Sequence, residues 1–226
     1  MKTPDYILPL EAAFKMRADP AKAIQMRKYM MGQFAFYGIH SPLRKEIYKT
    51  HKKQYGLIPE EQTTEIVRWC WKASEREYQY FAMEFMGKKQ RKVHSEIIGL
   101  YEYMITNKSW WDTVDFIAAH LVGSYFKQYP ESIESLTSKW LNSGNMWLQR
   151  TCLLFQLKYK SETDGKLLES YIVKLASSKG FFIRKAIGWA LREYSKTDAD
   201  FVVQFVKTLA LSGLSEREAL KWLRNK

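Results

Sequence analysis

The segment FIRKAIGWALR (182–192) belongs to a repeat that decides the fold. Three earlier segments align with it without gaps: REYQYFAMEFM (76–86), WDTVDFIAAHL (111–121) and WLQRTCLLFQL (147–157). Their starts are separated by 35, 36 and 35 residues, and a weaker copy, EREALKWL (216–223), follows about one period later. Each copy has the spacing of an amphipathic helix, and the roughly 20 residues between copies can hold a second helix.

Helix pairs repeated at this period predict an α-solenoid, in which each repeat buries its apolar face against its neighbours. The period is shorter than the roughly 40–47 residues of armadillo and HEAT repeats, so we expect irregular HEAT-like repeats. The predicted fold is all-α, a right-handed solenoid that forms one domain over residues 1–226. We expect a monomer, because solenoid ends that are capped by polar residues need no partner.

The net charge indicates what the surface attracts. A formal charge of +12 and a pI near 9.5 favour polyanions, and nucleic acid is the first candidate. An anionic membrane surface or an acidic protein remains an alternative, because net charge does not choose among them. No stretch approaches the roughly 20 apolar residues of a membrane-spanning helix. The first apolar run is short and broken by Pro9 and Glu11, which argues against a signal peptide.

Cysteine and histidine usage excludes two kinds of site. The only cysteines, Cys70 and Cys152, each lie in an apolar helical pattern, which indicates buried thiols in a reducing cytosol. The four histidines are scattered and no CxxC motif occurs, so we expect no metal site and no cofactor.

The stretch SWWDTVD (109–115) opens the second repeat copy. Ser109 and Asp112 have capping-box spacing, which predicts that a helix begins directly after Ser109. The stripe expected to face the core consists of Trp110, Val114, Ile117 and Leu121. Trp111 and Asp115 are four residues apart and share a neighbouring face. Asp115 lies beyond the first turn, where the helix dipole would favour a carboxylate, so its presence calls for another reason.

The last full copy carries an unusual polar face. One stripe of this predicted helix consists of Lys185, Trp189, Arg192 and Lys196, and the opposite stripe is apolar. A tryptophan with cations one turn to either side suits a surface that meets phosphates and sugar-like groups.

Simpler interpretations compete with these. Trp111 and Trp189 could be buried between repeats, and Asp115 could form an inter-repeat ion pair with Arg150. Other basic residues, taken singly, are expected to be solvated surface charges: Arg44, Lys45, Lys158 and Lys160. The run KKQRK (88–92) indicates a basic loop at a helix end.

Together with three further segments, SWWDTVD resembles the AlkD-type DNA glycosylases, bacterial alkylpurine glycosylases that are built from HEAT-like repeats. The segments are RKYMMGQFAFYGIHSPLRK (27–45), NMWLQRTCLLFQLKYK (145–160) and SSKGFFIRKAIGWALREY (177–194). The resemblance spans nearly the whole chain, in order and without large insertions. It implies a concave basic face that binds double-stranded DNA.

The resemblance also implies roles for individual residues. The family's catalytic carboxylate falls on Asp115, and its two active-site tryptophans fall on Trp111 and Trp189. Residues expected to bind DNA are Arg150, Tyr29, His40, Arg44, Lys158, Lys185 and Arg192. The chain departs from the family pattern at His40, where a glutamine is expected, which leaves open the contacts to the strand opposite the lesion.

The implied activity is base-excision repair: hydrolysis of the N-glycosidic bond of cationic N3- or N7-alkylated purines, without flipping of the base into the protein. The implied location is the cytoplasm, in association with the nucleoid of a bacterium. The main alternative is a DNA-binding paralogue without enzymatic activity that recognises branched or distorted DNA. A protein-binding HEAT scaffold is a third interpretation, and the basic charge argues against it.

Overall fold

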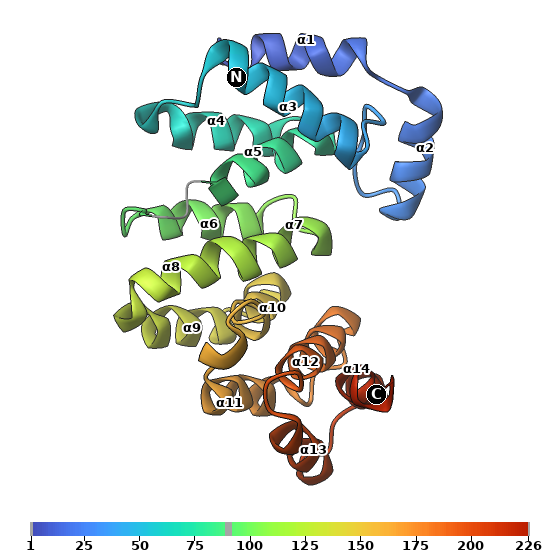
Figure 1. Cartoon of the computed structure of the whole chain (residues 1–226), viewed down its shortest axis with the longest axis vertical. Helices are drawn as coiled ribbons and strands as arrows, with labels where there is room; N and C mark the ends of the chain where they lie inside the picture. The colour runs from blue at the N-terminus through green and yellow to red at the C-terminus, as the bar shows by residue number, and fades with distance from the viewer. Residues whose placement is uncertain (1, 89–91, 226) are drawn as a thin grey trace. The chain divides into compact units, whose positions relative to one another are not determined.

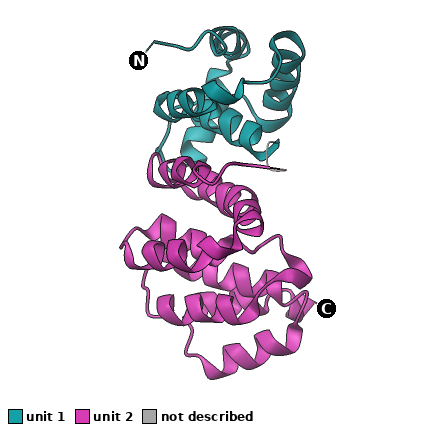
Figure 2. Ribbon diagram, turned by 90° about the vertical axis from the view of Figure 1, so that its left-hand side faces the viewer, with its two compact units in different colours: residues 1–88 teal, residues 89–226 magenta. Residues whose placement is uncertain are grey.

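The computed structural model of the chain describes residues 2–88 and 92–225, which are helical and contain no strand (Figure 1). A single isolated bridge pairs Ala35 with Glu75. Contacts divide the chain into two compact units, residues 1–88 and residues 89–226 (Figure 2). The all-α prediction is confirmed, and the single domain over residues 1–226 stays a prediction. Residues 89–91 of the predicted basic loop lie outside the described residues.

Unit 1 packs its helices around an aromatic core. Phe14 of the first helix contacts Tyr78 of the last, with ring centroids 5.4 Å apart. The buried Glu77 carboxylate of this last helix accepts hydrogen bonds from the backbone N–H groups of residues 37–39 at 3.0 to 3.1 Å, which fixes that loop. The helices are α1 (Leu8–Met16), α2 (Pro20–Tyr29), α3 (Ser41–Tyr55), η1 (Glu60–Gln62), α4 (Thr63–Lys72) and α5 (Arg76–Lys88).

Unit 2 contains the remaining repeat copies. Its helices are α6 (Ile97–Thr106), α7 (Trp111–Phe116), η2 (Ile117–Val122), α8 (Gly123–Gln128), η3 (Pro130–Ser132), α9 (Ile133–Asn142), α10 (Met146–Leu154), η4 (Lys160–Glu162), α11 (Gly165–Leu175), α12 (Phe181–Tyr194), α13 (Ala199–Thr208), α14 (Gly213–Leu220) and η5 (Leu223–Asn225). No helix in the described part of the chain is long and apolar enough to cross a membrane.

The repeat predicted from the sequence is present in the structure. Each of its four strong copies begins within one residue of a helix start, at α5, α7, α10 and α12, and the weaker copy overlaps α14. Within unit 2, α10 packs against α7, α12 packs against α10, and α14 packs against α12. Successive copies therefore bury their apolar faces against one another, as expected of a helical-repeat fold.

The predicted capping box is wrong. Helix α7 begins at Trp111, and the residue before it, Trp110, makes no side-chain cap. The Ser109 hydroxyl instead donates to the carbonyl of Ile105, 2.6 Å away at the end of α6. The last carbonyls of a helix lack partners within the helix, and the Ser109 hydroxyl binds one of them. The same hydroxyl therefore does not cap the start of α7.

The three segments α7, η2 and α8 form one helical run whose middle is a π-helix. The predicted inward stripe is largely confirmed, because Val114, Ile117 and Leu121 are fully buried and Trp110 is half-buried. A π-helical turn widens the helix locally and is frequent at functional sites. Here it begins at Ile117, two residues after Asp115.

Candidate active site

Asp115 is held by Arg150 from the next repeat. The Arg150 Nε atom lies 2.7 Å from Oδ1 of Asp115, and Nη2 lies 2.8 Å from Oδ2. Arg150 is 4% exposed, and its Nη1 also donates to the carbonyl of Phe182 on α12. The inter-repeat ion pair considered from the sequence is therefore present, and Arg150 fixes the geometry of a carboxylate.

Burial dominates the electrostatics of Asp115. Removal from water raises the pKa of its carboxyl above the ordinary value, and the hydrogen bonds and charge of Arg150 oppose that change. A bidentate guanidinium bond fixes both oxygens in one plane, yet each oxygen keeps a lone pair for another donor.

The carboxylate faces a hollow of about 380 Å³, which we call the Asp115 hollow. The two predicted active-site tryptophans, Trp111 on α7 and Trp189 on α12, both line it and both are half-buried. The full lining consists of Trp111, Asp115, Arg150, Phe181, Phe182, Lys185, Trp189, Arg192 and Glu218. Three successive repeat helices, α7, α10 and α12, thus bring together six residues that the sequence singled out. Trp111 and Trp189 are not confined to the core.

The other two cations of this hollow, Lys185 and Arg192, are also paired. Lys185 Nζ lies 2.8 Å from Oε1 of Glu218, and Arg192 Nη1 lies 3.0 Å from Oε2 of the same residue. Hydrogen bonding from Lys185 is the largest influence on Glu218 and lowers the pKa of its carboxyl. The pKa of Asp115 is thus raised and the pKa of Glu218 is lowered within one hollow. Carboxyl groups whose pKa values are moved apart in this way are typical of active sites.

A smaller hollow of about 170 Å³ shares Asp115 and Trp189 with the first, and we call it the side hollow. His120 and Lys158 also line it, and both are exposed. Partial burial and the charge of Lys158 lower the pKa of His120, so its imidazole is neutral at pH 7. His120 lies within the π-helical segment η2, which begins two residues after Asp115.

Three predicted DNA-binding residues lie in unit 1. Tyr29, at the end of α2, is 70% exposed, and His40, directly before α3, is exposed as well. Arg44 is not a solvated charge as expected: it is 7% exposed and forms an ion pair with Glu84 at 2.5 Å. Its guanidinium also lies over the Tyr80 ring, 4.6 Å from the centroid. Arg44 therefore links α3 to α5.

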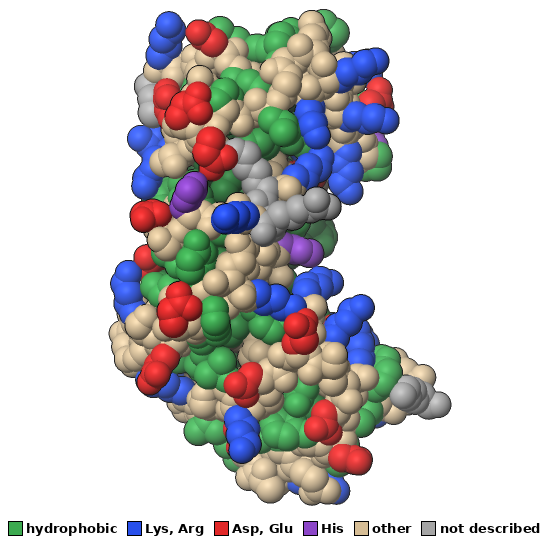
Figure 3. Space-filling view, turned by 60° about the vertical axis from the view of Figure 1, so that its left-hand side comes forward, with side chains coloured by type: hydrophobic (Ala, Val, Ile, Leu, Met, Phe, Trp, Pro, Cys, Tyr) green, Lys and Arg blue, Asp and Glu red, His purple; other side chains and the backbone are tan. Residues whose placement is uncertain are grey.

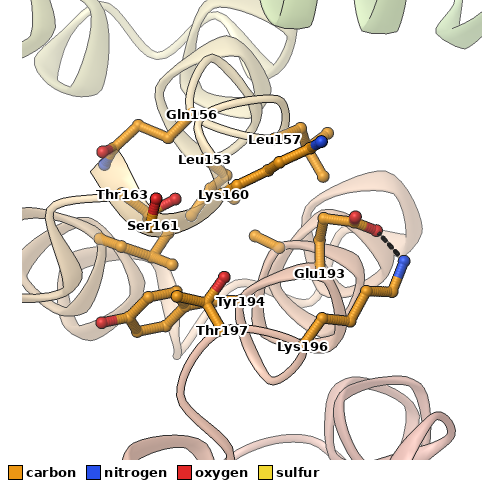
Figure 4. A pocket seen from close by; sticks show the side chains of 12 residues that line it. Leu153, Gln156, Leu157, Lys160, Ser161, Thr163, Glu193, Tyr194, Lys196 and Thr197 are labelled. Atoms are coloured by element: carbon orange, nitrogen blue, oxygen red, sulfur yellow. Dashed lines mark hydrogen bonds and ion pairs between the residues drawn. The ribbon is translucent and has the colours of Figure 1, made fainter.

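Another hollow, of about 420 Å³, is drawn in Figure 4 and lies beside the C-terminal half of α12. Apolar side chains such as Leu153 and Leu157 line one part of it, and Tyr194 and hydroxyl groups line another. Its one carboxylate, Glu193, is bound to Lys196 at 2.7 Å. Its described lining holds none of the predicted site residues and no aromatic pair flanking a carboxylate, so the Asp115 hollow is the better candidate for an active site.

The molecular surface carries mixed charge. On the face in Figure 3, basic side chains are spread over both units with acidic ones between them. Among the described residues, no group of three or more His, Cys, Asp or Glu side chains could hold a metal ion.

Comparison with known proteins decides the family. Residues 10–223 match the model of a family described as DNA alkylation repair enzyme. The chain belongs to the family of DNA alkylation repair enzymes. A comparison with the curated proteins finds no significant match.

Solved structures agree with this membership. A predicted DNA alkylation repair enzyme from Enterococcus faecalis is 33% identical, with a TM-score of 0.83 over 92% of this chain and 98% of its own. AlkD2 from Streptococcus mutans is 17% identical, with a TM-score of 0.58 over 80% of this chain and 88% of its own. Another protein of that organism, smu.31, is 18% identical with a TM-score of 0.58, over 80% of this chain and 96% of its own. The latter two share the fold.

Three residues that line the Asp115 hollow of this DNA alkylation repair enzyme have no role predicted from the sequence: Phe181, Phe182 and Glu218. Glu218 lies in the weak repeat copy, which predicts a helix but no role for its charges. The carbonyl of Phe182 accepts a hydrogen bond from Arg150, and its ring lies 5.0 Å from that of Trp147. The local pattern contains no signal for either long-range contact.

Proposed function

We propose that the protein hydrolyses the N-glycosidic bond of cationic N3- and N7-alkylated purines in double-stranded DNA. The observation that carries this proposal is the Asp115 carboxylate, which Arg150 fixes in a hollow that two indole side chains also line. This arrangement suits a positively charged sugar.

Hydrolysis of this bond requires a carboxylate that stabilises the sugar, and it does not require a general acid that protonates the leaving base. An alkylated purine is already positively charged, so it leaves as a neutral base without being protonated. The bond from the anomeric carbon to the purine nitrogen breaks and its electron pair departs with the base. The sugar then carries oxocarbenium character, which a fixed carboxylate stabilises. The water oxygen bonds to the anomeric carbon, and its proton passes to Asp115 and on to solvent.

The indole faces of Trp111 and Trp189 supply a second source of stabilisation. An indole face attracts a cation by about 0.5–2 kcal/mol, depending on how far water is excluded. Neither hydroxyl nor amide side chains occur among the described lining residues of the Asp115 hollow. Because such groups read the edges of an extruded base, their absence from the lining supports recognition of charge and sugar without base flipping.

The test is release of 3-methyladenine and 7-methylguanine from methylated duplex DNA, measured by chromatography. We expect release by the wild type and a loss of about 10²–10⁴-fold in Asp115→Asn. Asp112→Asn is the matched control, because it removes a carboxylate from the same helix but outside the hollow. Circular dichroism and duplex binding would verify that each variant is folded. DNA binding without release by the wild type would refute the glycosylase and favour a binder of distorted DNA.

A further inference from the structure

The Glu218 carboxylate forms ion pairs with two cations, Lys185 and Arg192. Lys185 and Arg192 are seven residues apart on α12, about 10.5 Å along the helix axis. Their side chains nevertheless converge on the two oxygens of one carboxylate, at 2.8 and 3.0 Å. All three side chains are partly exposed beside the Asp115 hollow, with 19–37% of their surface accessible.

The position of Glu218 is set by close packing of α14 on α12. A Cβ atom at Gly188 would lie 2.5 Å from the Cβ of Glu218 and 2.7 Å from the carbonyl oxygen of Ser215, so only glycine permits this approach. The Ser215 hydroxyl donates to the carbonyl of Arg184 at 3.0 Å, and Ala219 is fully buried. Docking of α14 therefore depends on backbone and small side chains, and the ion pairs are additional to it.

An anion between a lysine and an arginine, next to an indole, has the surroundings that a DNA phosphate would need. A phosphodiester carries one negative charge, as Glu218 does, and binds the same two kinds of cation. Partly exposed ion pairs contribute little to stability, so their partners exchange easily.

We propose that Glu218 is an internal counter-ion that holds the place of a DNA phosphate between Lys185 and Arg192. Binding of DNA transfers the two cations from Glu218 to the backbone phosphate nearest the lesion. This inference rests on the proposed function and adds a residue that sets specificity. A polyanion must displace the Glu218 carboxylate before it can bind both Lys185 and Arg192. Only a DNA backbone that reaches fully into the hollow can do so.

The experiment compares Glu218→Gln with Glu216→Gln in binding to a short unmodified duplex, by fluorescence anisotropy over a range of salt concentrations. Both variants raise the net charge by one, but Glu216 is exposed on the same helix and lies outside the Asp115 hollow. We expect Glu218→Gln to bind about 3- to 30-fold more tightly than Glu216→Gln. The slope of log Kd against log salt should steepen by about one.

A second variant separates charge exchange from any structural effect. If Glu218 competes with phosphate through its two cations, the gain in Glu218→Gln should shrink when Lys185→Gln is added. Binding by Glu218→Gln that equals or falls below that of Glu216→Gln would overturn the inference, since Glu218 would then only brace the cations. The duplex is unmodified, so failure here leaves base release untouched. Failure of base release with a normal Glu218→Gln gain would refute only the proposed function.

Discussion

Arg150 binds both oxygens of Asp115 across one repeat, with nitrogen–oxygen distances of 2.7 and 2.8 Å. The same guanidinium donates to the carbonyl of Phe182 in the following repeat. One side chain thus joins α7, α10 and α12 at the candidate active site. Such a pair adds little net stability compared with apolar packing, but breaking it leaves a buried charge without a partner.

Replacing Arg150 by lysine tests this geometry. A lysine keeps the charge but cannot bond both carboxylate oxygens and the Phe182 carbonyl in one plane. We expect the free energy of unfolding in urea to fall by about 1–3 kcal/mol. Single-turnover base release should fall about 10²-fold. Arg217→Lys, at an exposed position on α14, is the control and should change neither quantity. A fully active Arg150→Lys would mean that Asp115 needs no fixed orientation.

The raised pKa of Asp115 predicts an acid limb in the pH profile of base release. The active form is the carboxylate, and burial raises its pKa above the ordinary value of 3.8. The rate should therefore be constant at neutral pH and fall as pH drops through this raised pKa. Single-turnover rates from pH 4 to 8, corrected for spontaneous depurination, measure the effect.

His120 is the alternative source of such a limb, because its pKa is lowered from 6.5 by partial burial and by Lys158. His120→Gln distinguishes the two groups. The limb should persist in this variant if Asp115 causes it. Disappearance of the limb would instead make His120 the group whose neutral form is required.

The helices of the repeat were predictable because their signal is local. The 35-residue period and the apolar spacing place four helix starts to within one residue. Arg44 could also have been placed in the core of unit 1, because Ile47, Tyr48 and His51 extend one buried face of α3 from it. An arginine considered without these neighbours is expected to be solvated, which is why the prediction for Arg44 is wrong.

The site was predictable only in part. Trp111, Asp115 and Trp189 stand out as residues that an apolar pattern does not require. The counter-ion of Lys185 is Glu218, 33 residues later in the chain, and no local pattern joins them. At Ser109 a local pattern is present but misleading. The spacing to Asp112 predicts a helix cap, whereas the hydroxyl donates to the nearby carbonyl of Ile105.

Trp189 should contribute through its indole face. Replacement by leucine removes the ring, and we expect single-turnover base release to fall about 2- to 30-fold, the equivalent of 0.5–2 kcal/mol. Trp189→Phe should lose less, because it retains an aromatic face. Trp140→Phe is the control, because Trp140 is fully buried and its Nε1 donates to Glu102 at 3.1 Å. That variant should unfold at lower urea and keep its rate while folded. An unchanged rate in Trp189→Leu would remove the indole from the mechanism.

Gly188 should be intolerant of even a methyl group. Alanine usually stabilises a helix by up to about 1 kcal/mol relative to glycine. At Gly188, however, the new Cβ would lie 2.5 Å from that of Glu218 and 2.7 Å from the Ser215 carbonyl oxygen, so α14 must move away. We expect Gly188→Ala to lower the free energy of unfolding by about 1–3 kcal/mol. Gly99→Ala, in α6 with no atom within 4 Å of the added Cβ, should be neutral or stabilising. Urea unfolding of the two variants gives the comparison, and equal stability would show that α14 docks without this close contact.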